Sequence, residues 1–290
     1  MKHNLYAISI LLAVFLLAQV VGLAVTSHYI EKPKLPLNIE RPVVPEKQQS
    51  YTFIPIFIFI IIATVLGLLL IKFSMLRLWK LWFLISVWLC LTISFNAFIS
   101  EKIAVGIAAV LALLKVFKPS VIIHNFTEIF IYGALAAIFV PILNVIAVVV
   151  LLALISVYDY IAVRRTKHMV KLAKFQGKSR LFAGLLLPYK RKIEAGEIKP
   201  VGKTAVLPKE KSGVAILGGG DIGFPLLFAG VVMRQFGFGL FDYRVFIIPV
   251  FAAISLMLLF LLANNRKFYP AMPYISAGCL AGYGVVRFLV

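Results

Sequence analysis

"ILGGGDIGFP", residues Ile216 to Pro225, places one carboxylate directly behind three consecutive glycines in an otherwise apolar segment. A charge inside the hydrocarbon layer of a membrane is costly, so an acidic residue in such a segment indicates a function by default. The surrounding sequence decides whether this segment belongs to a membrane protein.

Composition places the chain far outside the range of soluble domains. Hydrophobic residues make up 62% of the sequence and charged residues 14%, with a mean hydropathy of +1.01. These values predict an all-α polytopic membrane protein. Cys90 and Cys279 lie in apolar runs far apart in the sequence. They predict neither a disulfide nor a thiolate metal site, and we expect both to be packing residues.

About nine segments have the roughly 20 apolar residues that a helix needs to cross the hydrocarbon layer. We expect the first to be retained rather than removed as a signal peptide. Lys115 and Lys118 end the short fourth span, and we expect their side chains to extend toward the membrane surface. The predicted spans are 4–27, 52–74, 81–99, 103–117, 121–140, 142–163, 213–233, 244–263 and 271–290.

Basic residues predict the orientation. Of the 30 Lys and Arg residues, 14 lie between Arg164 and Lys211. The positive-inside rule then predicts a cytosolic N terminus and an external C terminus in the cell membrane. The formal charge of +19 therefore indicates a lipid bilayer, and no nucleic acid, as the partner. Within the basic segment, "SRLFAGLLLPYKRK" could form a strand or an interfacial patch.

The chain divides at this basic segment. We predict an N-terminal membrane part, 1–163, with six spans and the first functional aspartate on the sixth. A basic cytosolic loop, 164–212, follows. The C-terminal membrane part, 213–290, then carries the last three spans.

Only three of the eleven acidic residues lie inside predicted spans: Glu128, Asp159 and Asp221. Asp159 comes five residues before Arg164, and Asp221 comes ten residues after Lys211. The two aspartates are therefore expected in the cytosolic third of the membrane on neighbouring helices. Glu128 is expected to pair with a basic group or to lie at the start of a shorter fifth span.

Glycines and prolines surround this expected pair. The glycines before Asp221 free the backbone and remove side-chain bulk, so that another chain could approach. Pro270 and Pro273, in "YPAMPYISAG", lack backbone donors and predict a broken or extended entrance to the last span. Gly278 and Gly282 have the GxxxG spacing of a helix-packing face.

Together these pieces resemble the presenilin and signal peptide peptidase family of intramembrane aspartyl proteases, especially its compact archaeal members. A GxGD pattern alone also occurs in prepilin peptidases, but the three motifs in this order make the likeness specific. Met272 stands where the family has leucine, a swap that roughly conserves volume. The matching motifs are Tyr158-Asp159, Gly218-Gly219-Gly220-Asp221 and Pro270-Ala271-Met272-Pro273.

The resemblance implies a presenilin-like fold and a protease whose catalytic pair is Asp159 and Asp221. One carboxylate would take a proton from water while the other, protonated, donates to the peptide carbonyl. It implies transmembrane peptide substrates, with no metal and no cofactor. A homo-oligomer and a monomer both stay open. The glycines, the Pro270–Pro273 motif and the extended "SGVAIL" would hold an unwound substrate as an added strand, with Tyr158 packed or hydrogen-bonded near the pair.

The alternative from another class is a proton- or cation-coupled transporter or channel, because intramembrane aspartates also bind protons and sodium. The expected position away from the midplane and the lack of an inverted repeat weigh against it. Zinc and serine intramembrane proteases fit poorly, because the sequence has no HExxH and no serine nucleophile motif in a span.

Overall fold

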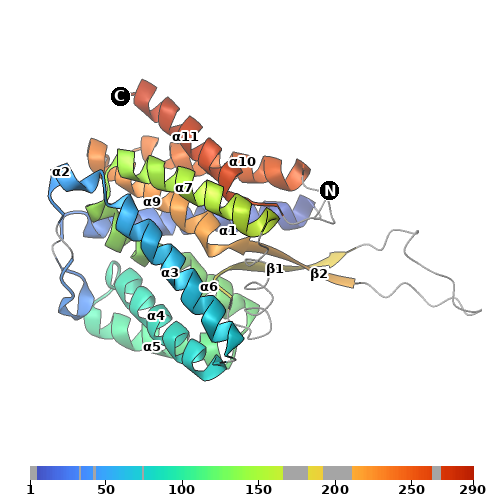
Figure 1. Ribbon diagram of the computed structural model, residues 1–290. Coiled ribbons are helices and arrows are strands. Elements are labelled where there is room, and N and C mark those ends of the chain that lie inside the picture. Colours follow the sequence, from blue (N-terminus) through green and yellow to red (C-terminus); the bar gives the residue numbers. More distant parts are fainter. Residues whose placement is uncertain are drawn as a thin grey trace, which may run out of the picture.

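The computed structural model describes residues 5–32, 34–41, 44–73, 75–165, 182–191, 211–262 and 269–290. This part of the chain is mostly helical, as predicted, with one pair of antiparallel strands (Figure 1). The helices are α1 (Leu5–Tyr29), α2 (Glu46–Gln49), α3 (Phe53–Lys72), α4 (Leu76–Asn96), α5 (Glu101–Phe117), α6 (Val121–Phe139), α7 (Val145–Arg164), α9 (Gly219–Phe236), α10 (Arg244–Leu262) and α11 (Met272–Phe288). Short 3-10 turns, η1 (Pro36–Asn38) and η2 (Val140–Ile142), and the strands β1 (Gly184–Arg191) and β2 (Lys211–Gly218) complete the elements.

Six of the described helices are long and apolar enough to cross a membrane: α1, α3, α4, α6, α7 and α10. Helices α5, α9 and α11, with 17, 18 and 17 residues, overlap the other three predicted spans. The count of nine spans therefore stays a prediction, although most helix boundaries fall within a few residues of the predicted ones.

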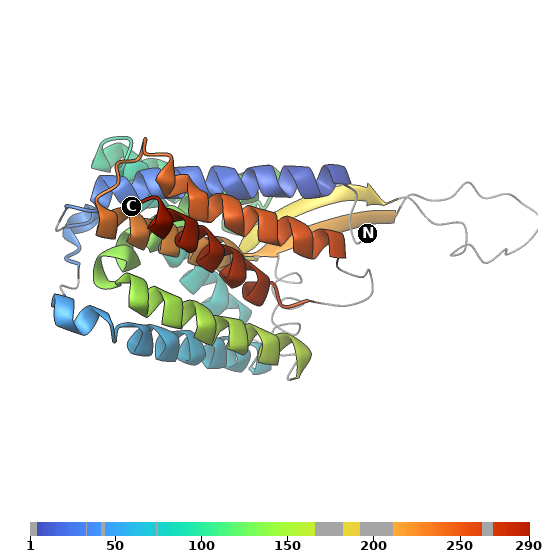
Figure 2. The same ribbon diagram turned by 90° about the horizontal axis from the view of Figure 1, so that it is seen from above.

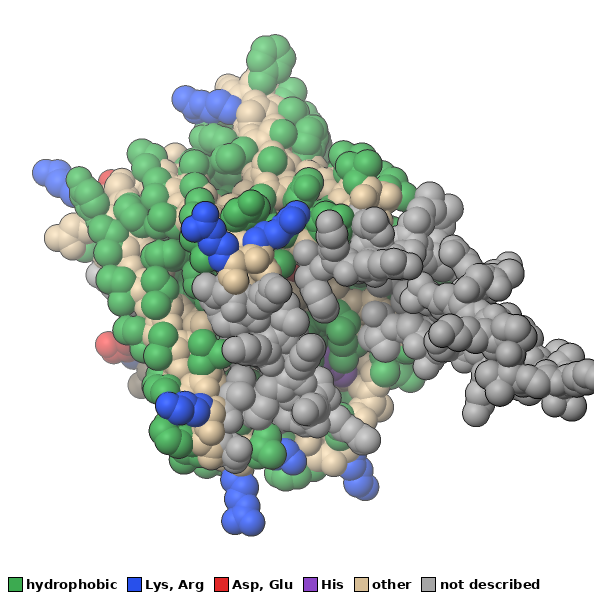
Figure 3. All heavy atoms as spheres, turned by 45° about the vertical axis from the view of Figure 1, so that its right-hand side comes forward, with side chains coloured by type: hydrophobic (Ala, Val, Ile, Leu, Met, Phe, Trp, Pro, Cys, Tyr) green, Lys and Arg blue, Asp and Glu red, His purple; other side chains and the backbone are tan. Residues whose placement is uncertain are grey.

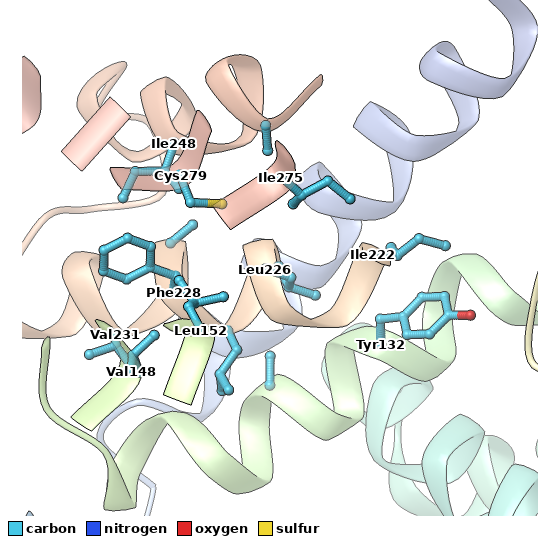
Figure 4. Packing of buried hydrophobic residues seen from close by; sticks show 14 of the residues in the cluster. Tyr132, Val148, Leu152, Ile222, Leu226, Phe228, Val231, Ile248, Ile275 and Cys279 are labelled. Atoms are coloured by element: carbon cyan, nitrogen blue, oxygen red, sulfur yellow. The ribbon is translucent and has the colours of Figure 1, made fainter. Parts of the chain in front are cut away.

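Helix α9 lies at the centre of the bundle. It contacts α1, α6, α7, α10 and α11, and the turned view shows the long helices running side by side (Figure 2). Phe228 of α9, Leu152 of α7 and Cys279 of α11 meet in one buried apolar cluster (Figure 4). Cys279 is a free, buried thiol and Cys90 is free and partly buried, so both pack within the bundle as expected.

The GxxxG spacing of α11 packs against α10, as predicted. A Cβ at Gly278 would lie 2.1 Å from Ser255 Oγ and 2.6 Å from the Phe251 carbonyl oxygen, and one at Gly282 would lie 3.1 Å from the Ile248 Cα. The two helices approach this closely only because neither glycine has a side chain.

Gly278→Ala is expected to lower the free energy of unfolding by about 1 to 3 kcal/mol, the range for forced overpacking of a tight contact. The neighbouring Phe251 carbonyl belongs to a helix backbone and cannot rotate away. Gly284→Ala, on the same helix, is the matched control, because its added methyl would meet nothing within 4 Å. Equal thermal melting temperatures for the two purified variants in detergent would contradict this packing.

The described surface is largely apolar. Hydrophobic side chains dominate the face seen in Figure 3. Only 11% of the apolar window Phe53–Leu70 in α3 is buried, and Phe59 is 61% exposed. A water-soluble protein does not expose such a continuous apolar surface, so lipid is the solvent that fits it.

The start of the predicted seventh span, 213–233, is wrong. Residues 211–218 form β2, which pairs antiparallel with β1, and α9 begins only at Gly219. The side chains alternate as in a strand, because Ala215 and Leu217 are buried while Ile216 is exposed. The strand alternative for "SRLFAGLLLPYKRK" is confirmed by β1.

The hairpin marks one end of the bundle. Both ribbon views show β1 and β2 projecting where α1 begins, whereas α11 ends at the opposite end (Figures 1 and 2). The first and last helices thus place the two chain ends on opposite sides of the bundle.

Candidate active site

The structure brings Asp159 and Asp221 together at the hairpin end of the bundle. Asp159 lies near the end of α7 and is only 5% exposed. Asp221 is the third residue of α9, a helix that packs against α7, and it is partly buried. The two carboxyl groups are close enough to interact electrostatically. Two acids held this close in a poorly solvated site favour sharing a proton.

The proline motif holds Asp159. The backbone N–H of Met272 donates to Asp159 Oδ2 at 3.1 Å, and the N–H of Ala271 also donates to this carboxyl group. These donors lie at the start of α11, where the first N–H groups of a helix have no partner within the helix. Pro270 and Pro273 shape this helix start, because proline suits an N-terminal turn and cannot extend a helix toward its N-terminal side. The predicted break at this entrance is confirmed.

The glycine motif positions Asp221. The Asp221 carboxyl accepts the backbone N–H of Gly218, the N-cap residue of α9, as the acid of a capping box does. A Cβ at Gly219 would lie 2.9 Å from the Tyr132 hydroxyl, whereas one at Gly220 would make only an ordinary contact with Phe224. Gly218 has φ −65°, which any residue can adopt. The glycines here therefore allow Tyr132 to come close to the backbone, and no left-handed conformation requires them.

Tyr158, the residue before Asp159, contacts two residues of a neighbouring helix. Its hydroxyl donates to Thr64 Oγ1 at 3.0 Å, and its ring packs edge-on against Phe57 at 6.4 Å between centroids. Both partners belong to α3. The tyrosine next to Asp159 therefore ties α3 to α7 through its contacts with Thr64 and Phe57.

The hairpin has one occupied edge. The backbone N–H and C=O groups of Gly184 and Leu186 in β1 are bonded to side chains of α6. These groups therefore point away from β2, and the pairs Gly184↔Gly218 and Leu186↔Ile216 are non-hydrogen-bonded pairs of the ladder. Pro188, two residues further, lies at another outward position, where its missing N–H breaks no ladder bond.

The other edge of the hairpin is the outer edge of β2. The same alternation directs the N–H and C=O of Ile216 away from β1. Within the described part of the chain these two groups have no recorded hydrogen-bond partner. This edge leads through Gly218 directly to Asp221.

A buried ion pair lies beside the hairpin. Lys115 Nζ of α5 is 2.6 Å from Glu128 Oε1 of α6, and both side chains are 1% exposed. The expectation that Glu128 pairs with a basic group is confirmed. The expectation that Lys115 reaches the membrane surface is wrong, because pairing with a buried carboxylate outweighs exposure. A lysine and a glutamate in consecutive predicted spans were the signal for this pair.

Gln19 is a site residue that the sequence analysis missed. It is fully buried on α1, and its Nε2 donates at 2.9 Å to the carbonyl of Ile222, the residue after Asp221. Its Oε1 has no partner within the described residues. A glutamine in the middle of an apolar span was the available signal.

Metal ligands do not gather at this site. Among the residues described, no group of three His, Cys, Asp or Glu side chains is arranged to hold a metal ion. The chemistry that the described geometry offers is that of two carboxyl groups, each of which accepts backbone N–H donors.

Residues 12–290 match the family of signal-peptide peptidase and presenilin aspartyl proteases. The chain belongs to this family. It is an aspartic endopeptidase of the intramembrane-cleaving type and an integral membrane protein. A search of the curated proteins found no match.

Two solved structures of a presenilin family intramembrane aspartate protease share the fold. The structure in space group C222 has a TM-score of 0.65 and 17% identity, covering 98% of this chain and 99% of that one. The structure in space group P2 has a TM-score of 0.58 and 16% identity, covering 97% of each chain. Neither the family nor these structures supports the transporter alternative.

Proposed function

We propose that Asp159 and Asp221 together hydrolyse peptide bonds within or near the transmembrane helices of membrane-protein substrates. The observation that carries this proposal is the convergence of both carboxyl groups at the start of α9, within electrostatic range of each other. Family membership supports peptide hydrolysis as the reaction. The position of the two aspartates among apolar helices supports the membrane as the place where it occurs.

The mechanism is general acid–base catalysis with an activated water. One carboxylate removes a proton from water as the water attacks the peptide carbonyl, and the protonated partner donates to the carbonyl oxygen. The proton then passes to the leaving nitrogen as the C–N bond breaks. The two groups act as a coupled pair, so we assign the roles of base and acid to the pair and not to either residue.

The open edge of β2 is the proposed substrate-binding strand. A transmembrane helix hides its peptide groups in internal hydrogen bonds and must unwind before water can attack. An unwound segment that adds to β2 would exchange these bonds for bonds with Ile216 and be led toward Asp221. The Pro270–Pro273 motif, through its N–H bonds to Asp159, would border the same site.

Ile216→Pro is expected to lower kcat/KM for a transmembrane substrate by up to about tenfold, the value of one backbone hydrogen bond. It removes an N–H that points outward, so the hairpin's own ladder remains intact. Ile216→Ala is the matched control, since it shortens the side chain but keeps the N–H. Equal steady-state rates for the two variants would argue against strand addition here.

The proposed orientation places the hairpin and the carboxyl pair on the cytosolic side. It rests on the 14 basic residues between Arg164 and Lys211, which the positive-inside rule assigns to the cytosol. The homo-oligomer and the division at 163 and 212 stay predictions.

Inhibition by a peptide analogue of the tetrahedral intermediate tests the proposed function. Such an analogue carries a hydroxyl at the position of the attacked carbonyl and binds more tightly than substrate. We expect it to block cleavage of a single-span substrate by the purified protein in liposomes. Cleavage that persists at saturating analogue, or proton flux abolished by Asp221→Asn in a protein without proteolytic activity, would contradict the proposal and favour the transporter.

A further inference from the structure

Three side chains of one helix occupy the outer edge of β1. Asn125 of α6 donates to the Leu186 carbonyl at 2.7 Å and accepts the Leu186 N–H at 2.9 Å. His124 donates to the Gly184 carbonyl at 2.7 Å, and the Gly184 N–H donates to Glu128 Oε2 at 3.0 Å. These side chains bond β1 as a third strand would, so we call His124, Asn125 and Glu128 the edge clamp.

Glu128 of the edge clamp is held in place by a buried ion pair. The Glu128 carboxylate that accepts the Gly184 N–H is also paired through its other oxygen with Lys115, which donates to Thr127 Oγ1 at 2.8 Å. All of these side chains are buried. A buried carboxylate that moves away from its ion-pair partner leaves its charge unpaired, which is costly, so Glu128 is held in one position. Its hydrogen bond then fixes the position of Gly184 along the axis of α6.

The edge clamp is connected to the carboxyl pair. The hydroxyl of Tyr132 in α6 donates to Glu128, and it lies 2.9 Å from the place that a Cβ at Gly219 would take. The N–H of Gly219 donates to the Ala183 carbonyl at 3.1 Å, next to Gly184. Asp221 follows two residues later. The hairpin and the first turn of α9 are therefore held by the same side chains of α6.

We propose that the edge clamp positions the hairpin along the substrate and thereby selects the peptide bond that reaches the aspartates. This role rests on the proposed function, in which the substrate adds to β2. Because the edge clamp occupies the outward groups of Gly184 and Leu186 in β1, the β2 edge is the one that remains open beside the aspartates among the described residues. A strand advances about 3.4 Å per residue, so a slip of two residues would move the substrate by about 7 Å and present a different bond.

Asn125→Ala tests this positioning role, because it removes both bonds to Leu186 and leaves the buried ion pair intact. We expect kcat/KM to fall by about tenfold, as for the loss of two hydrogen bonds. We also expect mass spectrometry to find new cleavage positions displaced from the wild-type one. A merely structural residue would change the amount of active protein without changing the cleaved bond.

Asn96→Ala is the matched control. Asn96 also donates a side-chain amide hydrogen bond, at 3.0 Å to the Tyr29 hydroxyl, but from α4. It should keep the wild-type cleavage position. Asn125→Asp is the second variant, to be used if Asn125→Ala does not fold. It retains the acceptor for the Leu186 N–H and loses the donor, so a smaller displacement is expected.

The outcomes separate this role from the proposed function. If the wild type cleaves and Asn125→Ala, or Asn125→Asp when only that variant folds, cuts at the same position, the role of the edge clamp alone is overturned, whatever the value of kcat/KM. A wild-type protein that cleaves no transmembrane substrate would overturn the proposed function and this role with it. Displaced cleavage positions confined to the Asn125 variants would support both.

Discussion

Asp221→Asn is expected to lower the rate of substrate cleavage by about 10³-fold, because one of the two groups that move protons in the reaction is lost. The fold should remain, since the asparagine oxygen can still accept the Gly218 N–H that caps α9. Asparagine occupies the same volume as aspartate, so packing against α7 is preserved. Initial rates of cleavage in detergent, compared at equal protein concentration, measure the effect.

Asp242→Asn is the matched control for that change. Asp242 lies between α9 and α10, and its hydrogen bonds from Arg244 lower the pKa of its carboxyl group, so it is ionised at neutral pH. The same chemical change there should leave the cleavage rate at the wild-type value. If Asp221→Asn retained more than about a tenth of wild-type activity, the carboxyl at position 221 would not be part of the acid–base pair.

Lys115→Met is expected to lower the free energy of unfolding by about 3 to 5 kcal/mol, because it leaves the Glu128 carboxylate buried without its partner. Methionine has nearly the volume and shape of the lysine stem, so packing between α5 and α6 changes little. Thermal unfolding in detergent, followed by circular dichroism, measures the loss. Activity should fall as well, since Glu128 also accepts the Gly184 N–H at the edge of the hairpin.

Two variants distinguish this ion pair from general damage to α5. Lys118→Met, at the residue that follows the end of α5, removes an exposed lysine and should change stability by no more than about 0.5 kcal/mol. The double change Lys115→Met with Glu128→Gln should recover most of the lost stability, because a neutral amide needs no counter-charge. Equal losses in the single and double variants would mean that the buried charge is not the cause.

The sequence predicted the position of the carboxyl pair because few residues carry a charge inside apolar segments. Asp159 and Asp221 each lie a few residues from the basic segment. The boundary between this segment and the apolar spans can be read from the sequence by hydropathy and charge. The proline motif could be placed for a similar reason, since Pro270 and Pro273 limit where the last helix begins.

The sequence could not predict contacts between residues on different helices. The partner of Lys115 depends on how α5 and α6 rotate against each other, and hydropathy does not specify that rotation. The orientation of Tyr158 toward α3 and the bonds of His124 and Asn125 to β1 depend on packing in the same way. The short run before Gly219 was ambiguous, because an apolar segment of 4 to 8 residues fits a strand or a buried helix equally.

Mass spectrometry of the products from a single-span substrate, reconstituted in liposomes with the purified protein, tests the central claim most directly. The two-aspartate mechanism predicts two fragments whose new termini lie within or next to the membrane span, and none with Asp159→Asn and Asp221→Asn combined. The same fragments from the doubly changed protein, or cleavage confined to the water-exposed tails of the substrate, would contradict it.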